Sequence, residues 1–264
     1  MQAAYEALMS TPPGTAYVVA TGTLTNMGVL FTAYPKLASH IKGLHIMGGA
    51  IGSSFTPAPM GVISNDSGTS REERFGNWSK YAEFNIYCDP EAAQSLFTNP
   101  ELKTKIMLVP LDLSHLFLAT RQVQEALLHG FDQEQRVQVS TVRQLFNEIL
   151  TFFAQTYADV FGLVQGPPLH DVLPVLAIMA PNIFDDHGGE RFDVDVVIDG
   201  AHGTEGIART ESRVGQTVVK TITEGSSGVR IPRNLNTDVA WRMIDLCLDL
   251  AEQRSAKRTV VRPA

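Results

Sequence analysis

Short runs of consecutive apolar residues alternate along the chain with longer segments that have helical spacing. Such runs predict strands buried on both faces of a sheet, and they cover residues 16–20, 44–47 and 106–110. The predicted helices cover residues 2–9, 27–41, 91–97, 121–129, 137–161 and 172–179. Strand, glycine turn, helix and strand again is the βαβ arrangement of a parallel sheet. The pattern therefore predicts an α/β fold, with a mostly parallel sheet flanked by helices and a Rossmann-like core.

Two parts of the chain depart from this alternation. Residues 50–75 are rich in Gly, Ser and Pro and carry a charge run, so we expect a flexible surface insertion in a single domain over residues 1–264. The insertion is either surface decoration or a lid over the site. Residues 192–198 and 214–222 predict two strands, as a hairpin or an edge pair. A final helix is expected from about residue 237 to 251, with Asn236 or Thr237 as its N-cap. Residues 254–264 are expected to be frayed.

The composition excludes several classes of protein. Hydrophobic residues make up 44% and charged residues 19% of the 264 residues, which is typical of a globular protein. The net charge of −7 argues against partners such as nucleic acid or an anionic membrane, and no apolar run is long enough to cross a membrane. Cys88 and Cys247 are too few for a disulfide framework or a cysteine-based zinc site. We expect a cytoplasmic protein with reduced thiols.

The stretch over residues 76–90 carries the strongest candidate site. Asn77, Glu83 and Asn85 stand among apolar side chains, and they supply the hydrogen-bond donors and acceptors that a polyhydroxylated ligand such as a sugar requires. Asp89 and the proline after it open a helix, so the polar cluster is expected on a loop just before that helix. The alternative is an ordinary polar loop followed by a helix cap.

Other polar candidates follow predicted strands or open helices, where α/β folds gather their ligands. Thr21 follows the first strand, and Met47 with the Gly48-Gly49 pair follows the second. His170 and Asp171 stand at the start of a helix. The imidazole is a candidate general acid and the carboxylate a candidate ligand for a hard cation. The alternatives are a tight glycine turn and a capping aspartate beside a surface histidine.

A second such pair, Asp112 and His115, is expected to have a structural role. The chain contains no Gly-x-Ser-x-Gly nucleophile motif, no P-loop and no Gly-x-Gly-x-x-Gly motif. The sequence therefore gives no support to serine hydrolase or nucleotide-phosphate chemistry.

In their order and spacing, these features resemble the inosine-uridine-preferring nucleoside hydrolase family. The matching stretches are Thr21-Gly22-Thr23-Leu24-Thr25-Asn26, Ile46-Met47-Gly48-Gly49, Gly76-Asn77-Trp78-Ser79, Ala82-Glu83-Phe84-Asn85, Asp89-Pro90-Glu91-Ala92-Ala93, Leu111-Asp112-Leu113-Ser114-His115, His170-Asp171 and Gly215-Gln216-Thr217-Val218-Val219. The resemblance extends from about residue 5 to about residue 250, apart from the insertion.

The resemblance implies an enzyme that cleaves the N-glycosidic bond of purine and pyrimidine ribonucleosides with water, using calcium, in nucleoside catabolism and salvage. It implies that the main-chain carbonyl of Thr21 and the carboxylate of Asp171 are calcium ligands. His170 would protonate the departing base. It also suggests a dimer or a tetramer. The residues that would hold the ribose hydroxyls or line the pocket are Met47, Asn77, Glu83, Phe84 and Asn85.

One departure from the family pattern affects the expected activity. Members of the family begin with a strand that ends in an Asp-x-Asp-Pro-Gly-x-Asp-Asp motif, which supplies most calcium ligands and the base that activates water. The chain contains no such motif, so we expect an N-terminally truncated member that lacks its first strands, on the order of a hundred residues. Such a chain is expected to bind the sugar but not to bind calcium tightly or hydrolyse nucleosides unaided.

Two further interpretations compete with a truncated hydrolase. The chain could be a non-catalytic remnant that binds nucleosides or ribose, or that serves as an interaction module. A glycosidase acting on larger sugars has little support, because Glu83 has no evident partner carboxylate for acid–base catalysis.

Overall fold

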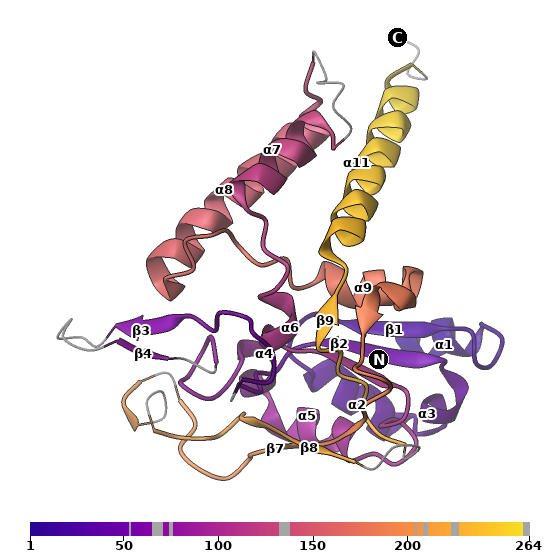
Figure 1. The fold of residues 1–264 in the computed structure, drawn as a ribbon. Helices are drawn as coiled ribbons and strands as arrows, with labels where there is room; N and C mark the ends of the chain where they lie inside the picture. Colours follow the sequence, from indigo (N-terminus) through magenta and orange to yellow (C-terminus); the bar gives the residue numbers. More distant parts are fainter. Residues whose placement is uncertain are drawn as a thin grey trace. The chain divides into compact units, whose positions relative to one another are not determined.

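The structure is a computed structural model that describes residues 1–52, 54–64, 71–73, 76–131, 138–203, 205–207, 211–222 and 227–260. The chain divides into two compact units (Figure 1). Unit 1 comprises residues 1–116 and 169–235, and unit 2 comprises residues 117–168 and 236–264. In the described residues, no helix is long and apolar enough to span a membrane.

Unit 1 is built on a parallel sheet of three strands. The strands are β1 (Tyr17–Ala20), β2 (Gly43–Met47) and β5 (Ile106–Val109), in the order β1-β2-β5. All three predicted strands are confirmed to within three residues at each end, and all of β2 and β5 is buried. The central position of β2 explains its continuous apolar run, because both of its faces are covered.

Helices cover both faces of this sheet (Figure 1). Against one face pack α2 (Thr25–Ala33), α3 (Lys36–His40) and α5 (Pro90–Phe97), whose apolar side chains join those of the strands in one buried cluster. Against the other face lies α9 (Val172–Met179), which contacts all three strands. The predicted α/β fold with a parallel sheet is confirmed.

Two predictions for the start of unit 1 are wrong. The helix expected over residues 27–41 is two helices, because Pro35 has no N–H to donate and holds Tyr34 out of the helical region, at φ −130°. The first strand was expected to be buried on both faces, but three of its four residues are only half-buried. Within the described residues β1 pairs on one side only, with β2.

The strands predicted near the end of unit 1 form the antiparallel pair β7 (Phe192–Val196) and β8 (Thr217–Thr221). Every second residue of β7 is buried, as expected for a strand with one covered face, and β7 contacts α5. The second strand begins later than predicted because Gly215 has φ +79°, a conformation that extended strands do not contain. The expectation of a paired hairpin or edge pair is confirmed.

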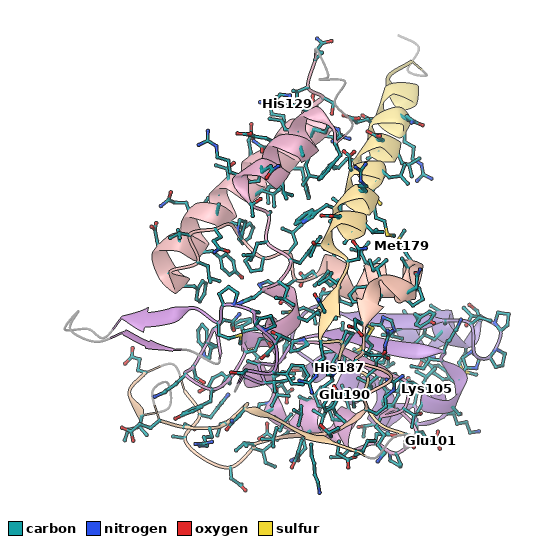
Figure 2. All side chains as sticks on the ribbon, in the orientation of Figure 1. Glu101, Lys105, His129, Met179, His187 and Glu190 are labelled. Atoms are coloured by element: carbon teal, nitrogen blue, oxygen red, sulfur yellow. The ribbon has the colours of Figure 1, made fainter. Side chains whose placement is uncertain are left out.

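The described residues of unit 1 also contain two shorter antiparallel pairs. One joins β6 (Phe184–Asp185) to β9 (Asn234–Leu235), after the 3₁₀ helix η1 (Pro181–Ile183). The loop after β6 holds His187 and Glu190, which Figure 2 labels and which lie 3.7 Å apart (Nδ1 to Oε2).

The expected insertion at residues 50–75 contains the other pair, β3 (Val62–Ser64) with β4 (Arg71–Glu73). Its first part is anchored in the core, because Ala50 and Met60 are buried together with Met47. Residues 53, 65–70, 74 and 75 lie outside the described residues. The interpretation of residues 50–75 as an insertion in one domain stays a prediction.

The remaining helices of unit 1 are short. They are α1 (Gln2–Met9), α4 (Phe84–Cys88) and α6 (Leu111–Ser114). The first confirms its predicted bounds, and Tyr5 stacks on Tyr34 at 4.1 Å between ring centroids.

Unit 2 contains α7 (Arg121–His129), α8 (Thr141–Phe161) and α11 (Thr237–Val260). Ser140 caps α8, so this helix starts later than predicted, and Asn236 accepts a hydrogen bond from the Val239 N–H at the start of α11. The final helix continues through residues that were expected to fray, because they are mostly good helix formers without Gly or Pro. Residues 261–264 lie outside the described part.

One buried cation joins the helices of unit 2. The guanidinium of Arg143 in α8 is fully buried, and it lies 2.7 Å from the Asp245 carboxylate and 2.5 Å from the Asp249 carboxylate of α11. Burial without such partners would strongly disfavour the charge. This ion-pair group therefore has a structural role within unit 2.

Candidate functional site

The candidate site begins at the turn that follows β2. Met47 ends the strand, and Gly49 has φ +84°. A Cβ atom on residue 49 would lie 2.8 Å from the Thr217 hydroxyl, so both the backbone conformation and the available space require glycine here. Gly49 donates its N–H to Oε2 of Glu83 at 2.9 Å. The turn is thus tied to the polar cluster predicted around residue 83.

Glu83 is a buried carboxylate that caps α4. Besides the bond from Gly49, it accepts the N–H groups of Asn85 (2.9 Å) and Ile86 (3.2 Å). A carboxylate has about four acceptor positions, so these three bonds leave about one for a ligand hydroxyl. Burial raises the pKa of this carboxyl, and the nearby negative charge of Asp171 raises it further. The polar cluster was expected on a loop, but Phe84 and Asn85 lie in a short helix, because Glu83 satisfies its first N–H groups.

Asn85 connects the short helix to the end of β2. Its side-chain nitrogen donates to the Met47 carbonyl at 3.1 Å and to the Met47 sulfur at 3.4 Å. Both N–H groups of the carboxamide are therefore directed at Met47, and the remaining function of this side chain is that of an acceptor through Oδ1. Asn85 is 8% exposed, so a hydrogen bond to a ligand hydroxyl would be made with little competition from water.

Asn77 and Phe84 form the outer part of the same cluster. Oδ1 of Asn77 accepts the Phe84 N–H at 2.9 Å, and the Phe84 ring is 44% exposed. Trp78 packs edge-on against that ring at 5.2 Å between centroids. The structure thus brings together the five residues that the resemblance assigned to sugar binding, in one hydrogen-bonded group within unit 1.

A second buried carboxylate holds the next part of the same turn. Asp112 accepts the N–H groups of Ile51 and Gly52, each at 2.8 Å, and burial raises its pKa. His115, one turn further on, has its Nδ1 atom 2.7 Å from the Pro59 carbonyl, and burial lowers its pKa to about 4. The structural role expected for Asp112 and His115 agrees with these contacts.

His170 lies beside this second region. Its Nδ1 atom is 2.7 Å from the hydroxyl of Ser114, and its ring centroid is 5.6 Å from that of His115. The residue keeps some exposure to solvent. Nevertheless, burial of the ring, with His115 beside it, lowers its pKa to about 3. His170 is therefore a neutral imidazole at neutral pH, and any proton it offers is an N–H proton of the neutral ring.

Asp171 and Thr21 occupy exposed positions. Asp171 is the N-cap residue of α9 but makes no side-chain cap hydrogen bond, so the structure does not support the interpretation as a capping aspartate. The protein atoms around the carboxyl still remove part of its hydration, which raises its pKa. Thr21 directly follows β1, at the carboxyl end of the sheet where β2 also ends. These two residues are the candidate oxygen donors for a cation.

The donor set does not fit a complete calcium site. Calcium binds about 6–8 oxygen ligands, whereas the candidates in the chain are the Asp171 carboxylate and the Thr21 carbonyl. Across the described residues, no group of three or more His, Cys, Asp or Glu side chains is placed to hold a metal ion. We therefore derive no chemical step through calcium.

Comparison with known proteins identifies the family of the chain. A model described as inosine-uridine preferring nucleoside hydrolase matches residues 1–242. The chain belongs to this family. The chain is similar to the uridine nucleosidase of Saccharomyces cerevisiae, to which it is 28% identical over 242 residues, covering 90% of the chain and 62% of the relative. The probable ribonucleoside hydrolase of Dictyostelium discoideum is 33% identical over 169 residues, covering 63% of the chain and 41% of the relative.

Solved nucleoside hydrolases share the fold. The purine-preferring ribonucleoside hydrolase from Gardnerella vaginalis superimposes with a TM-score of 0.65 at 16% identity, covering 94% of the chain and 64% of that structure. The plant nucleoside hydrolase PpNRh1 gives a TM-score of 0.64 at 21% identity, covering 92% and 64%. The chain thus spans less than two-thirds of the length of these nucleoside hydrolases.

Two residues hold parts of the candidate site in this nucleoside hydrolase family member, and sequence reasoning expected a structural role for Asp112 but missed Ser114. Asp112 holds the turn next to Glu83, and Ser114 holds His170. Both belong to the quoted stretch Leu111-Asp112-Leu113-Ser114-His115. Its position directly after a predicted strand was the only available signal, because contacts 56 to 61 residues apart leave no periodic pattern.

Proposed function

We propose that the chain forms the ribose-binding part of a ribonucleoside N-ribohydrolase site that acts on purine and pyrimidine ribonucleosides. The observation that carries the proposal is the buried group of Glu83, Asn85 and Met47 at the end of β2. A buried acceptor pair beside an exposed aromatic ring suits a ligand with vicinal hydroxyls and a flat apolar portion.

The reaction is the addition of water across the glycosidic bond. The bond between C1′ of ribose and the base nitrogen breaks, the water oxygen bonds to C1′, and one water proton ends on the base. In this proposal Glu83, Asn85 and Asn77 orient the sugar hydroxyls, while Phe84 excludes water from one side. His170 donates a hydrogen bond to the departing base, which stabilises its developing negative charge.

The proposal assigns sugar binding, but not unaided hydrolysis, to the chain. Asp171 and the Thr21 carbonyl would contribute to a calcium site whose other ligands the described residues do not supply. When bound, calcium supplies a hard cation that lowers the pKa of a water molecule and holds the ribose diol. We further place the protein in cytoplasmic nucleoside salvage, acting on a small molecule rather than on nucleic acid or a membrane, as a dimer or a tetramer.

Two measurements on the purified chain test this proposal. Isothermal titration with inosine and uridine is expected to show saturable binding, which Asn85→Ala weakens on the order of tenfold. Ribose release from either nucleoside, with calcium or with a chelator, is expected to stay at the uncatalysed rate. Absence of binding would contradict the ribose site, whereas calcium-dependent ribose release would contradict the limit placed on the chain.

A second candidate function is ribonucleoside or ribose binding without catalysis. The incomplete calcium donor set favours it, because in the described residues the proposed ribose-binding residues come together without a group of side chains that could hold a metal ion. The two candidates separate when a segment carrying paired aspartates is added in trans or by fusion. Gain of hydrolysis supports the enzyme, and unchanged binding without hydrolysis supports the binding protein.

A further inference from the structure

Ser114 is a buried hydroxyl with one close partner outside its own helix. It lies at the end of α6 with 0% exposure, and its Oγ atom is 2.7 Å from Nδ1 of His170. The histidine comes 56 residues later in the chain. The sequence offers no reason for this contact, which has a consequence for the histidine ring.

The direction of this hydrogen bond follows from where the hydroxyl proton can go. The alternative acceptor, the Leu111 carbonyl, is 3.5 Å away, beyond the usual O–H···O range of about 2.5–3.0 Å. That carbonyl already accepts the His115 N–H at 2.8 Å. If Nδ1 of His170 carried the proton and donated it to Ser114, the hydroxyl proton would lack a close acceptor among the described residues in a fully buried place, which is unfavourable. Ser114 therefore donates, and Nδ1 accepts.

The neighbouring histidine shows the opposite arrangement. Nδ1 of His115 lies 2.7 Å from the Pro59 carbonyl, an acceptor that cannot donate, so His115 carries its proton on Nδ1. Two adjacent imidazoles, 5.6 Å apart, are thus fixed as different tautomers by different partners. The contrast provides an internal reference for the assignment.

We propose that Ser114 is a positioning residue that holds His170 in the tautomer protonated at Nε2. The catalytic consequence of this inference rests on the proposed function, because His170 needs an Nε2–H group to donate a hydrogen bond to the departing base. Ser114 acts through His170 and does not contact the substrate. The class of substrate it serves is one whose leaving group is an anionic, nitrogen-containing base.

The test compares Ser114→Ala and Ser114→Thr in the full chain. Long-range proton–nitrogen NMR of ¹⁵N-histidine-labelled protein reports which ring nitrogen is protonated, with His170 assigned through the loss of its signals in His170→Gln. The wild type is expected to show His170 protonated at Nε2 and His115 at Nδ1. Ser114→Ala is expected to give a mixture at His170 only, and Ser114→Thr, which keeps the hydroxyl, is expected to restore the wild-type signature.

Ser212→Ala is the matched control, because Ser212 is also buried but accepts the Val214 N–H, away from His170. It is expected to leave the signature of His170 unchanged. A wild-type His170 protonated at Nδ1 would overturn the proposal, as would a His170 signature that is the same in Ser114→Ala and the wild type. If Ser114→Ala does not fold, the wild-type and Ser114→Thr spectra decide the question.

The NMR result does not require turnover, so it separates this inference from the proposed function. When the chain hydrolyses inosine together with the added segment that carries paired aspartates, Ser114→Ala is expected to lower kcat on the order of tenfold with little change in KM. This loss is smaller than the roughly 10²–10⁴-fold loss typical for removal of a proton donor itself. An unchanged kcat alongside a changed tautomer would overturn the catalytic consequence of the inference.

Discussion

Glu83 and Asp112 are both buried carboxylates that accept backbone N–H groups from the turn after β2, yet their surroundings differ. Glu83 lies beside the exposed ring of Phe84, the carboxamide of Asn85 and the charge of Asp171. Asp112 is also buried, and its pKa is shifted by burial and backbone bonds alone. Burial and backbone bonding are therefore common to both carboxylates and do not distinguish the proposed ligand site. The proposal assigns ligand binding to Glu83 because of its polar neighbours and its remaining acceptor capacity.

Removal of the Asp112 side chain is expected to have the largest effect on stability. Asp112→Ala leaves the N–H groups of Ile51 and Gly52 without acceptors, at roughly 1–3 kcal/mol each, so the free energy of unfolding should fall by about 3–5 kcal/mol. Urea unfolding followed by circular dichroism measures this loss. A loss below about 1 kcal/mol would show that the carboxylate does not hold the turn.

Substitution of Gly49 tests the turn that both carboxylates share. Gly49→Ala places a Cβ atom in a positive-φ conformation and against the Thr217 hydroxyl. The expected loss of stability is about 2–5 kcal/mol, from strain of roughly 1–2 kcal/mol and overpacking of roughly 1–3 kcal/mol. Gly188→Ala is the matched control, since Gly188 also has a positive φ but has open space around it. Equal losses for the two variants would contradict the packing contribution of Thr217.

Acidification is expected to weaken the Asp112 region through His115. Its pKa is about 4 in the folded protein and 6.5 ordinarily, so the unfolded chain binds the proton more readily. His115 therefore costs no stability above pH 6.5. As pH falls from 6.5 toward 4, the free energy of unfolding decreases by at most about 3 kcal/mol because of this buried histidine. Comparison of the wild type with His115→Asn between pH 7 and pH 4 isolates this loss, because the two buried carboxyls are common to both.

The exposed His129, at the end of α7, is the control for the acid experiment (Figure 2). His129→Asn should keep the pH dependence of the wild type, whereas His115→Asn should make it shallower without abolishing it, because His170 also has a lowered pKa. The same slope in all three proteins would show that His115 is not held neutral by its burial.

The smallest effect on stability, and the sharpest difference between the two regions, is expected at Glu83. Glu83→Gln removes one acceptor, so stability should fall by about 1–2 kcal/mol, while inosine binding weakens on the order of tenfold. Asp112→Asn is the matched change in the other region, and its inosine affinity should stay within about twofold of the wild type once the protein is folded. Equal losses of affinity would assign ligand binding to both carboxylates or to neither.

Local patterns predicted much of the fold and the residues of the sugar-binding group. The apolar runs located β1, β2 and β5 because buried parallel strands are continuously apolar. The break at Pro35 was missed because the apolar periodicity continues across it. The partial exposure of β1 was missed because composition does not reveal how many neighbours a strand has.

Within the site, residue types near one another in sequence were predicted and distant contacts were not. Asn77, Glu83 and Asn85 fall within nine consecutive residues, so their polar character among apolar neighbours is visible in the sequence. The contacts of Asp112 with residues 51 and 52, and of Ser114 with His170, depend on the tertiary fold. For this reason the sequence identified the residues of the proposed ribose site but not the distant contacts that hold them in place.

The most direct test of the ribose site is an NMR titration of the ¹⁵N-labelled chain with inosine, in which two backbone amides of the same turn are followed. The Gly49 amide is bonded to Glu83 and the Gly52 amide to Asp112. The account predicts saturable shifts of the Gly49 amide and the Asn85 side-chain amide, with the Gly52 amide nearly unchanged. No saturable shift at Gly49 and Asn85, or an equal shift at Gly52, would contradict the assignment of ligand binding to the Glu83 region.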